Sequence, residues 1–176
     1  SPLLLTDADH HFYRSFMKRL GKLAQWLEFC AGRHGLGMAR ASAAIAYASY
    51  TLCAMTGEND WKKAGKLLAA ALTDTILADG CPISRNPADA LALVADLLPL
   101  RTAYTARGRT PPPEFQVSLD RLMGFLRLMR HTEGALALFN GMGSTSFNLL
   151  GAVLAFDDAK ADPPATARYG GFQRLE

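Results

Sequence analysis

One segment, from Met38 to Met55, constrains the fold of this chain more than any other. It reads MARASAAIAYASYTLCAM, and Arg40 is the single ionised residue within it. A helix that is apolar around nearly its whole circumference is buried on several sides, and its small side chains let neighbouring helices approach closely. The segment therefore predicts an inner helix that more polar helices screen from solvent.

The helix before this segment is expected to begin near Thr6 or Asp7 and to end at Gly32. Its large apolar residues recur at three- and four-residue spacing, which predicts one apolar stripe along an amphipathic helix. That stripe contains Phe12, Phe16, Leu20, Leu23 and Leu27, with Lys18, Arg19 and Lys22 on the solvent side.

Start and stop signals predict three more long helices. The first begins at a cap formed by Asn59 or Asp60 and ends before the Asp79-Gly80 turn. The second begins at Pro87 after an Asn86 cap, and Pro99 is expected to kink or end it near Leu98. The third is expected over 114–130, after a proline-rich loop over 107–113. An extended piece over 135–139 and a last helix over 147–156 complete the prediction.

Helices joined by short connections favour antiparallel helical hairpins, so the fold class predicted is all-α. No strict repeat at a fixed period is present, which disfavours a regular solenoid. A buried helix alternating with charged helices suits part of an incomplete α/α toroid. The predicted organisation is one helical domain over 1–156, followed by an irregular tail over 157–176.

Composition argues against several classes of partner and site. The formal net charge is +3 without any dense run of lysine and arginine, which disfavours a nucleic-acid partner. No uncharged apolar run reaches about 18 residues, so no membrane span is predicted. Cys30, Cys53 and Cys81 lack metal-ligand spacing, so no metal or cofactor site is predicted, and Cys30 and Cys53 are expected to be buried thiols.

Several short motifs carry a resemblance to a known family. They are DG at 79–80 with ISRNP at 83–87, LPLR at 98–101, RH at 130–131 with EGALALFNG at 133–141, and GFQRL at 171–175. In this order they resemble the heparinase II/III-like proteins of bacteria, over about half of the chain. The resemblance implies an α/α toroid followed by a C-terminal β domain that is absent here. It also implies a periplasmic or cell-envelope location, with a cytoplasmic one left open.

The resemblance further implies a polysaccharide lyase that cleaves uronate-containing chains, such as heparan sulfate, by β-elimination. Such a lyase needs an acid and a base, together with cationic and amide donors for an acidic polysaccharide. His131 and Asp89 are the catalytic candidates, although Ser84 stands where the family carries a glutamate and Asp89 falls near its tyrosine. The substrate-binding candidates are Arg40, Arg85, Asn86, Asn140 and Tyr47.

Each candidate also has an explanation that needs no substrate. Asn86 can cap a helix, Asn140 can form a plain turn, and Tyr47 can pack in the core. His131 can interact with a helix C-terminus, whereas Arg40 and Arg85 can be solvated at the surface.

Three functions therefore remain open: a polysaccharide lyase, an inactive relative that binds acidic polysaccharides, and a helical scaffold for protein interactions. Lyase action would leave an unsaturated uronate that absorbs ultraviolet light. Binding without such an absorbance rise would favour the inactive relative. The scaffold predicts an exposed apolar groove and no affinity for oligosaccharides.

Overall fold

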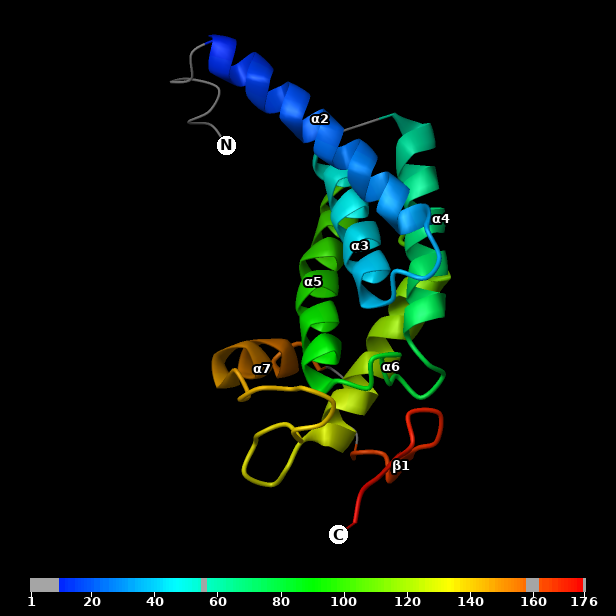
Figure 1. Cartoon of the computed structure of the whole chain (residues 1–176), viewed down its shortest axis with the longest axis vertical. Helices are drawn as coiled ribbons and strands as arrows, with labels where there is room; N and C mark the ends of the chain where they lie inside the picture. The colour runs from blue at the N-terminus through cyan, green and yellow to red at the C-terminus, as the bar shows by residue number, and fades with distance from the viewer. Residues whose placement is uncertain (1–9, 55–56, 158–161, 176) are drawn as a thin grey trace.

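The computed structural model describes residues 10–54, 57–157 and 162–175, and this part of the chain is mostly helical, with a two-stranded hairpin near its C-terminal end (Figure 1). The elements are α2 (His10–Gly32), α3 (Met38–Cys53), α4 (Glu58–Thr75), α5 (Pro87–Ala106), α6 (Pro113–Met129), α7 (Phe147–Leu154), β1 (Thr166–Ala167) and β2 (Phe172–Gln173). The all-α prediction is confirmed. The expected start of the first helix at Thr6 or Asp7 lies outside the described residues.

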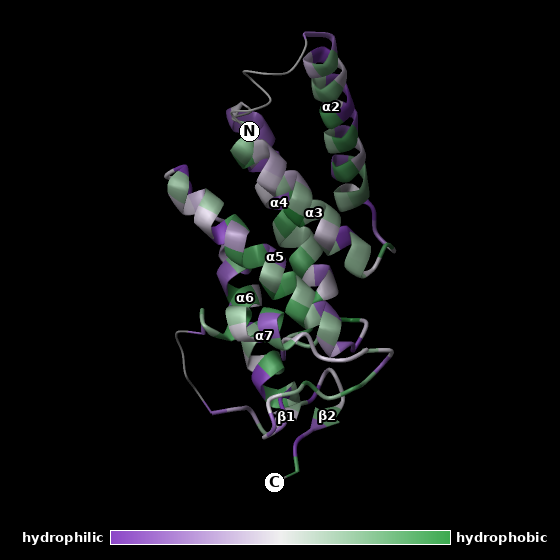
Figure 2. Cartoon of the chain, turned by 90° about the vertical axis from the view of Figure 1, so that its left-hand side faces the viewer, coloured by the Kyte–Doolittle hydropathy of each residue, from purple (hydrophilic) through white to green (hydrophobic). Residues whose placement is uncertain are grey.

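Helix α3 occupies the middle of the molecule, as its alanine-rich sequence predicts. It contacts α2, α4 and α5, and nine of its sixteen residues are buried. Alanines such as Ala41, Ala44 and Ala48 are fully buried, because a methyl side chain allows neighbouring backbones to come close. Figure 2 shows apolar residues gathered along α3 and α5, whereas polar and apolar residues alternate along α2.

The helices after α2 pack around one apolar core. Helix α3 runs antiparallel to α4 and α5 runs antiparallel to α6, whereas α3 also contacts α5, and α4 contacts α6, in the same direction (Figure 1). Large buried side chains from α4, α5 and α6 fill the space between them: Leu68, Leu72, Val94, Leu97, Leu100, Tyr104, Phe115, Leu122, Phe125 and Leu126.

Helix α5 begins as the sequence predicts but continues past its internal proline. The backbone N–H of Ala88 donates to the Asn86 side chain over 2.9 Å, and Pro87 is the first helical residue. The prediction that Pro99 ends or kinks the helix near Leu98 is wrong in its end point, since α5 runs to Ala106. Proline removes one helical hydrogen bond, but burial of Leu100 and Tyr104 beyond it stabilises the continuation.

The end of the chain folds back over α6. Strands β1 and β2 pair in antiparallel register, with Ala167 opposite Phe172, and Ala167 is buried. The Phe172 ring lies 5.9 Å from that of Phe125, measured between centroids. Arg174 donates through one terminal nitrogen to the carbonyl oxygens of Arg127, Leu128 and Arg130, at 3.4, 3.5 and 2.8 Å. It therefore adds a donor to carbonyl oxygens at and just beyond the end of α6, where helical N–H partners run out.

The cysteines are free thiols in three environments. Cys81 is buried and Cys30 is half-buried, whereas Cys53 is exposed. The expectation of a buried thiol at Cys53 is wrong because this residue is the last of α3, where the helix leaves the core. No helix in the described part of the chain combines the length and apolarity that crossing a membrane requires.

Candidate functional site

One face of α2 attaches this helix to the bundle. Ala24 and Ala31 are buried there, and Leu27 packs against the core. Glu28 accepts a hydrogen bond from the Tyr47 hydroxyl on α3 over 3.0 Å and pairs with Lys63 on α4. The ammonium group of Lys63 holds the pKa of the Glu28 carboxyl below its usual value, so this contact favours the ionised carboxylate.

A second face of α2 is apolar and exposed. We call it the α2 seam, and it consists of Phe12, Phe16, Arg19, Leu23, Trp26 and Cys30. Phe12 is 51% exposed, Leu23 50% and Trp26 59%, and the rings of Phe12 and Phe16 stack at 6.3 Å. The five residues of the predicted stripe lie within one arc of about 80° at 100° per residue, but only part of the stripe is covered: Leu27 packs against the core, whereas Phe12, Phe16 and Leu23 are exposed. The first turns of α2 project beyond the other helices (Figure 1).

The α2 seam is bordered by positive charge. At 100° per residue, Lys18 and Lys22 lie beside the seam on the side away from the bundle, and Arg19 lies within it. Across 10–32 the one acidic residue is Glu28, which is engaged by Lys63 and Tyr47. The exposed side of α2 therefore combines large apolar side chains with cations that have no carboxylate partner among the residues that the structure describes.

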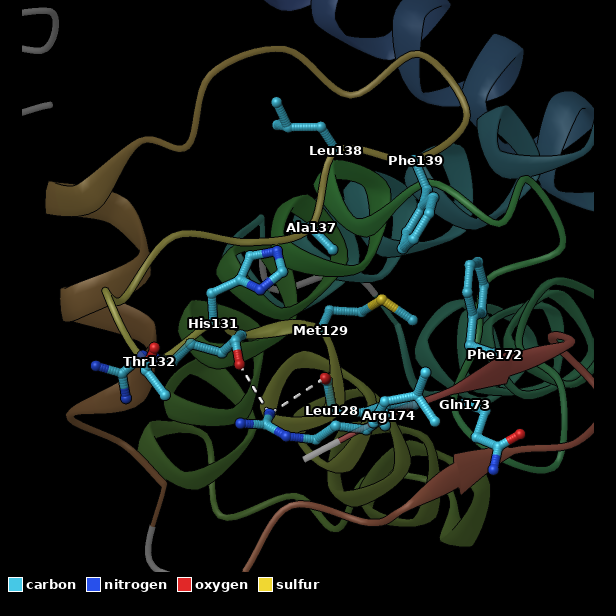
Figure 3. Close-up of a pocket in the computed structure, with 12 residues that line it drawn as sticks. Leu128, Met129, His131, Thr132, Ala137, Leu138, Phe139, Phe172, Gln173 and Arg174 are labelled. Atoms are coloured by element: carbon cyan, nitrogen blue, oxygen red, sulfur yellow. Dashed lines mark hydrogen bonds between the residues drawn. The ribbon is translucent and has the colours of Figure 1, made fainter.

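A cavity of about 390 Å³ lies between the end of α6 and β2 (Figure 3). Its lining residues include Met129, His131, Phe139, Phe172 and Arg174. Figure 3 shows the His131 ring, the Met129 side chain and the two phenylalanine rings around one space, with the Arg174 guanidinium turned towards backbone carbonyls. No carboxylate lines this cavity among the described residues, so it lacks an acid to pair with His131.

Four other candidate residues lie around the start of α5. Arg85 and Asn140 are exposed and both adopt positive φ angles, 56° and 51°. The Asn140 side-chain amide donates to the backbone carbonyl oxygen of Arg85 over 2.8 Å. The structure therefore brings these two residues together, although the hydrogen bond does not involve the Arg85 side chain. Asn86 caps α5, and Asp89 lies in its first turn. The positive φ at Asn140 suits asparagine, which tolerates this conformation better than most residues do.

Arg40 and Tyr47 are both buried and form contacts between helices. Arg40 donates to the Ala31 carbonyl oxygen over 2.9 Å and to His34 Nδ1 over 3.2 Å, and it pairs with Asp74 at the end of α4. The surface alternative for Arg40 is wrong, because the ends of α2 and α4 meet over its guanidinium. Burial, followed by the bond to Glu28, raises the pKa of Tyr47 to about 12. Sequence inspection missed the Asp74 contact because it joins positions far apart in the chain.

Asp79 and Gly80 form the turn that anchors the C-terminal hairpin. The Asp79 carboxylate accepts from the backbone N–H groups of Cys81, Tyr169 and Gly170, at 3.1, 2.6 and 2.8 Å. Burial raises the pKa of the Cys81 thiol to about 11, and the nearby Asp79 charge adds to this effect. The DG motif therefore has a structural role that requires no ligand.

The described residues contain no cluster of three or more histidine, cysteine, aspartate or glutamate side chains that could hold a metal ion. The exposed apolar face of α2 could have been found in the sequence, because its members recur at alternating spacings of four and three. Because this face adjoins the inner face of the helix, the periodicity shows both as one apolar stripe. It does not show which part of the stripe other helices cover.

Comparison with known proteins gives one informative similarity. The chain is 31% identical to FtsZ-localized protein C of Caulobacter vibrioides (strain NA1000 / CB15N) over 151 residues, which cover 82% of this chain and 26% of that relative. The chain thus spans about a quarter of the length of the relative that it matches. No family model matches the chain, and no solved structure matches it.

This similarity overturns the assignment to the heparinase II/III-like proteins. The matching relative is named for FtsZ and not for polysaccharide cleavage, so the lyase function, the acidic polysaccharide partner and the periplasmic or cell-envelope location are wrong. The motifs behind the assignment are short turns and caps. Asp79 binds backbone N–H groups, Asn86 caps α5 and Gly141 adopts a φ of 84°, which are local roles that unrelated helical proteins share.

Proposed function

We propose that this chain is a helical docking module of a protein that associates with FtsZ, and that the α2 seam is the surface through which it docks. The exposed seam carries this proposal: monomeric proteins rarely leave contiguous large apolar side chains in solvent, and such patches mark interaction sites. Similarity to FtsZ-localized protein C supplies the biological context. Trp26 is the expected anchor, since exposed tryptophans are enriched among residues that dominate binding energy.

The described site features favour docking over catalysis. The cavity near His131 has no lining carboxylate, and Arg40 and Tyr47 are occupied by contacts between helices. Glu28 and Lys63 fasten the C-terminal half of α2 to the bundle, so Leu23 and Trp26 of the seam lie on its supported part. A supported surface lowers the entropic cost of binding.

Co-sedimentation with purified FtsZ polymers tests this proposal. The chain is expected to pellet with FtsZ, and the double variant Leu23→Glu/Trp26→Glu is expected to lose at least roughly tenfold in affinity. The control Val117→Glu/Leu149→Glu adds the same charge at exposed apolar residues of α6 and α7, and it should bind normally. Failure of the unaltered chain to pellet with FtsZ would reject the assigned partner.

We also propose that the helical hairpins belong to a longer array of the incomplete α/α toroid type. The antiparallel packing of α3 with α4 and of α5 with α6 supports this arrangement. The chain spans only 26% of its longer relative, which leaves room for further hairpins. A structure of a longer chain from this family in which no helices continue the array would contradict it.

A further inference from the structure

We propose that the α2 seam receives one acidic amphipathic helix of a partner protein. This inference rests on the proposed role of the seam as a docking surface and adds the chemistry of what docks there. Its basis is the juxtaposition of an apolar seam with the spacing of a helix pair, a cation within that seam and further cations along its outer border.

The spacing of the seam is that of a helix pair. Positions 12, 16, 19, 23, 26 and 30 are separated alternately by four and three residues, the pattern that packs one helix along another. The inner face of α2 repeats it at Leu20, Ala24, Leu27 and Ala31; Ala24 and Ala31 are buried, Leu27 packs against the core, and α3 and α4 contact this helix. Helix α2 therefore has two faces built for helical neighbours, and one of them is open.

The charges determine which helix fits. Lys18 and Lys22 border the seam and would face the corresponding cations of a second copy, so like-charge repulsion disfavours a homodimer through this face. Glutamate or aspartate along the border of the incoming helix would pair with both lysines. Charged residues beside a helical seam set partner choice in this way.

Arg19 distinguishes a partner helix from a lipid surface. It lies between Phe16 and Leu23 in the seam and is exposed, so a helix that packs along these residues passes beside its side chain. A carboxylate on a facing helix can pair with Arg19, whereas hydrocarbon tails leave it uncompensated, and unpaired buried charge is costly. The position of Arg19 therefore favours a protein helix with an acidic residue at the centre of its own seam.

Calorimetric binding to synthetic helical peptides tests this chemistry. The probe is a peptide of roughly three heptads with leucine along its seam, glutamate along both borders and one glutamate facing Arg19. The matched control replaces every glutamate by lysine. The acidic peptide should bind at least roughly tenfold more tightly than the basic one, and added salt should weaken its binding.

Two variants locate the contact. Leu23→Glu/Trp26→Glu should abolish binding of the acidic peptide, and Arg19→Glu should weaken it by at least roughly tenfold. Val117→Glu/Leu149→Glu should bind as the unaltered chain does. All are surface changes, and unchanged far-ultraviolet circular dichroism verifies that each variant remains folded.

Three results would overturn the inference: equal affinity for the acidic and basic peptides, a stable dimer that Leu23→Glu/Trp26→Glu dissolves, or binding to anionic phospholipid vesicles without binding to the peptide. The two proposals fail separately. If the chain binds the acidic peptide but does not sediment with FtsZ, FtsZ is rejected as the partner and the acidic-helix inference stands. If the chain sediments with FtsZ through the α2 seam but does not bind the peptide, the acidic-helix inference is rejected and the proposed function stands.

Discussion

Replacing Gly80 by alanine should destabilise the fold far more than the same replacement at Gly35. Both glycines have nearly the same backbone angle, with φ of 84° and 85°. A left-handed conformation costs an alanine about 1–2 kcal/mol, while reduced freedom of the unfolded chain returns about 0.4–1 kcal/mol. The backbone effect alone therefore predicts a loss of about 1 kcal/mol at either position.

The two sites differ in what a methyl group would meet. A Cβ at Gly80 would overlap the carbonyl group of Arg121 on α6, whereas a Cβ at Gly35 has no neighbour within 4 Å. The turn at Gly80 would have to move away from α6, and overpacking of this kind costs about 1–3 kcal/mol. We therefore expect Gly80→Ala to lose about 2–4 kcal/mol and Gly35→Ala about 1 kcal/mol.

Urea denaturation followed by circular dichroism measures both free energies of unfolding. For a chain of this size, the expected difference corresponds to a melting temperature lower by roughly 4–8 °C in Gly80→Ala than in Gly35→Ala. Equal losses in the two variants would refute the reasoning, because they would show that the 79–80 turn does not lie against the α6 backbone.

Three further expectations concern buried and paired groups. Native protein treated with a thiol reagent at pH 8 should be modified at Cys53 but not at Cys81, because the Cys81 thiol is buried and has a pKa of about 11. Peptide mass spectrometry measures the labelling, and equal labelling of the two cysteines would contradict the burial of Cys81. Arg40→Ala should lower the free energy of unfolding by about 1–3 kcal/mol, because the partly solvated Asp74 loses its charged donor; an unchanged urea midpoint would contradict this. The folded state lowers the pKa of Glu28, so the contribution of this carboxylate to the free energy of unfolding is complete above pH 4.5 and is lost as the pH falls below that value. In Glu28→Gln the free energy of unfolding should therefore fall less steeply with decreasing pH than in the unaltered chain.

Sequence reasoning succeeded where neighbouring residues decide the structure. The alanine-rich segment predicts a central helix, and α3 is that helix. Asn86 and Pro87 predict the start of α5, and the structure begins it there. Of the two outcomes predicted at Pro99, a kink or an end, the end is wrong, because the burial of Leu100 and Tyr104 supports the helix beyond the proline.

The site was less accessible to sequence reasoning. Short turn and cap motifs suggested a lyase, although turns and caps recur wherever a backbone makes the same local geometry. The face that carries the docking proposal was visible as apolar residues, but its exposure was not. Periodicity shows that a side of a helix is apolar, whereas only the packing of α3 and α4 shows which apolar side remains uncovered.

The sequence by itself determined the helical class, the inner position of α3 and the cap of α5, since these depend on side chains within a few residues of one another. The tertiary structure alone decided that Arg40 would pair with Asp74, that Glu28 would fasten α2 through Lys63, and that Trp26 would face solvent. Arg40 and Asp74 lie 34 positions apart, and Glu28 and Lys63 lie 35 apart. Contacts at such separations form only after helices have packed, so no local pattern specifies them.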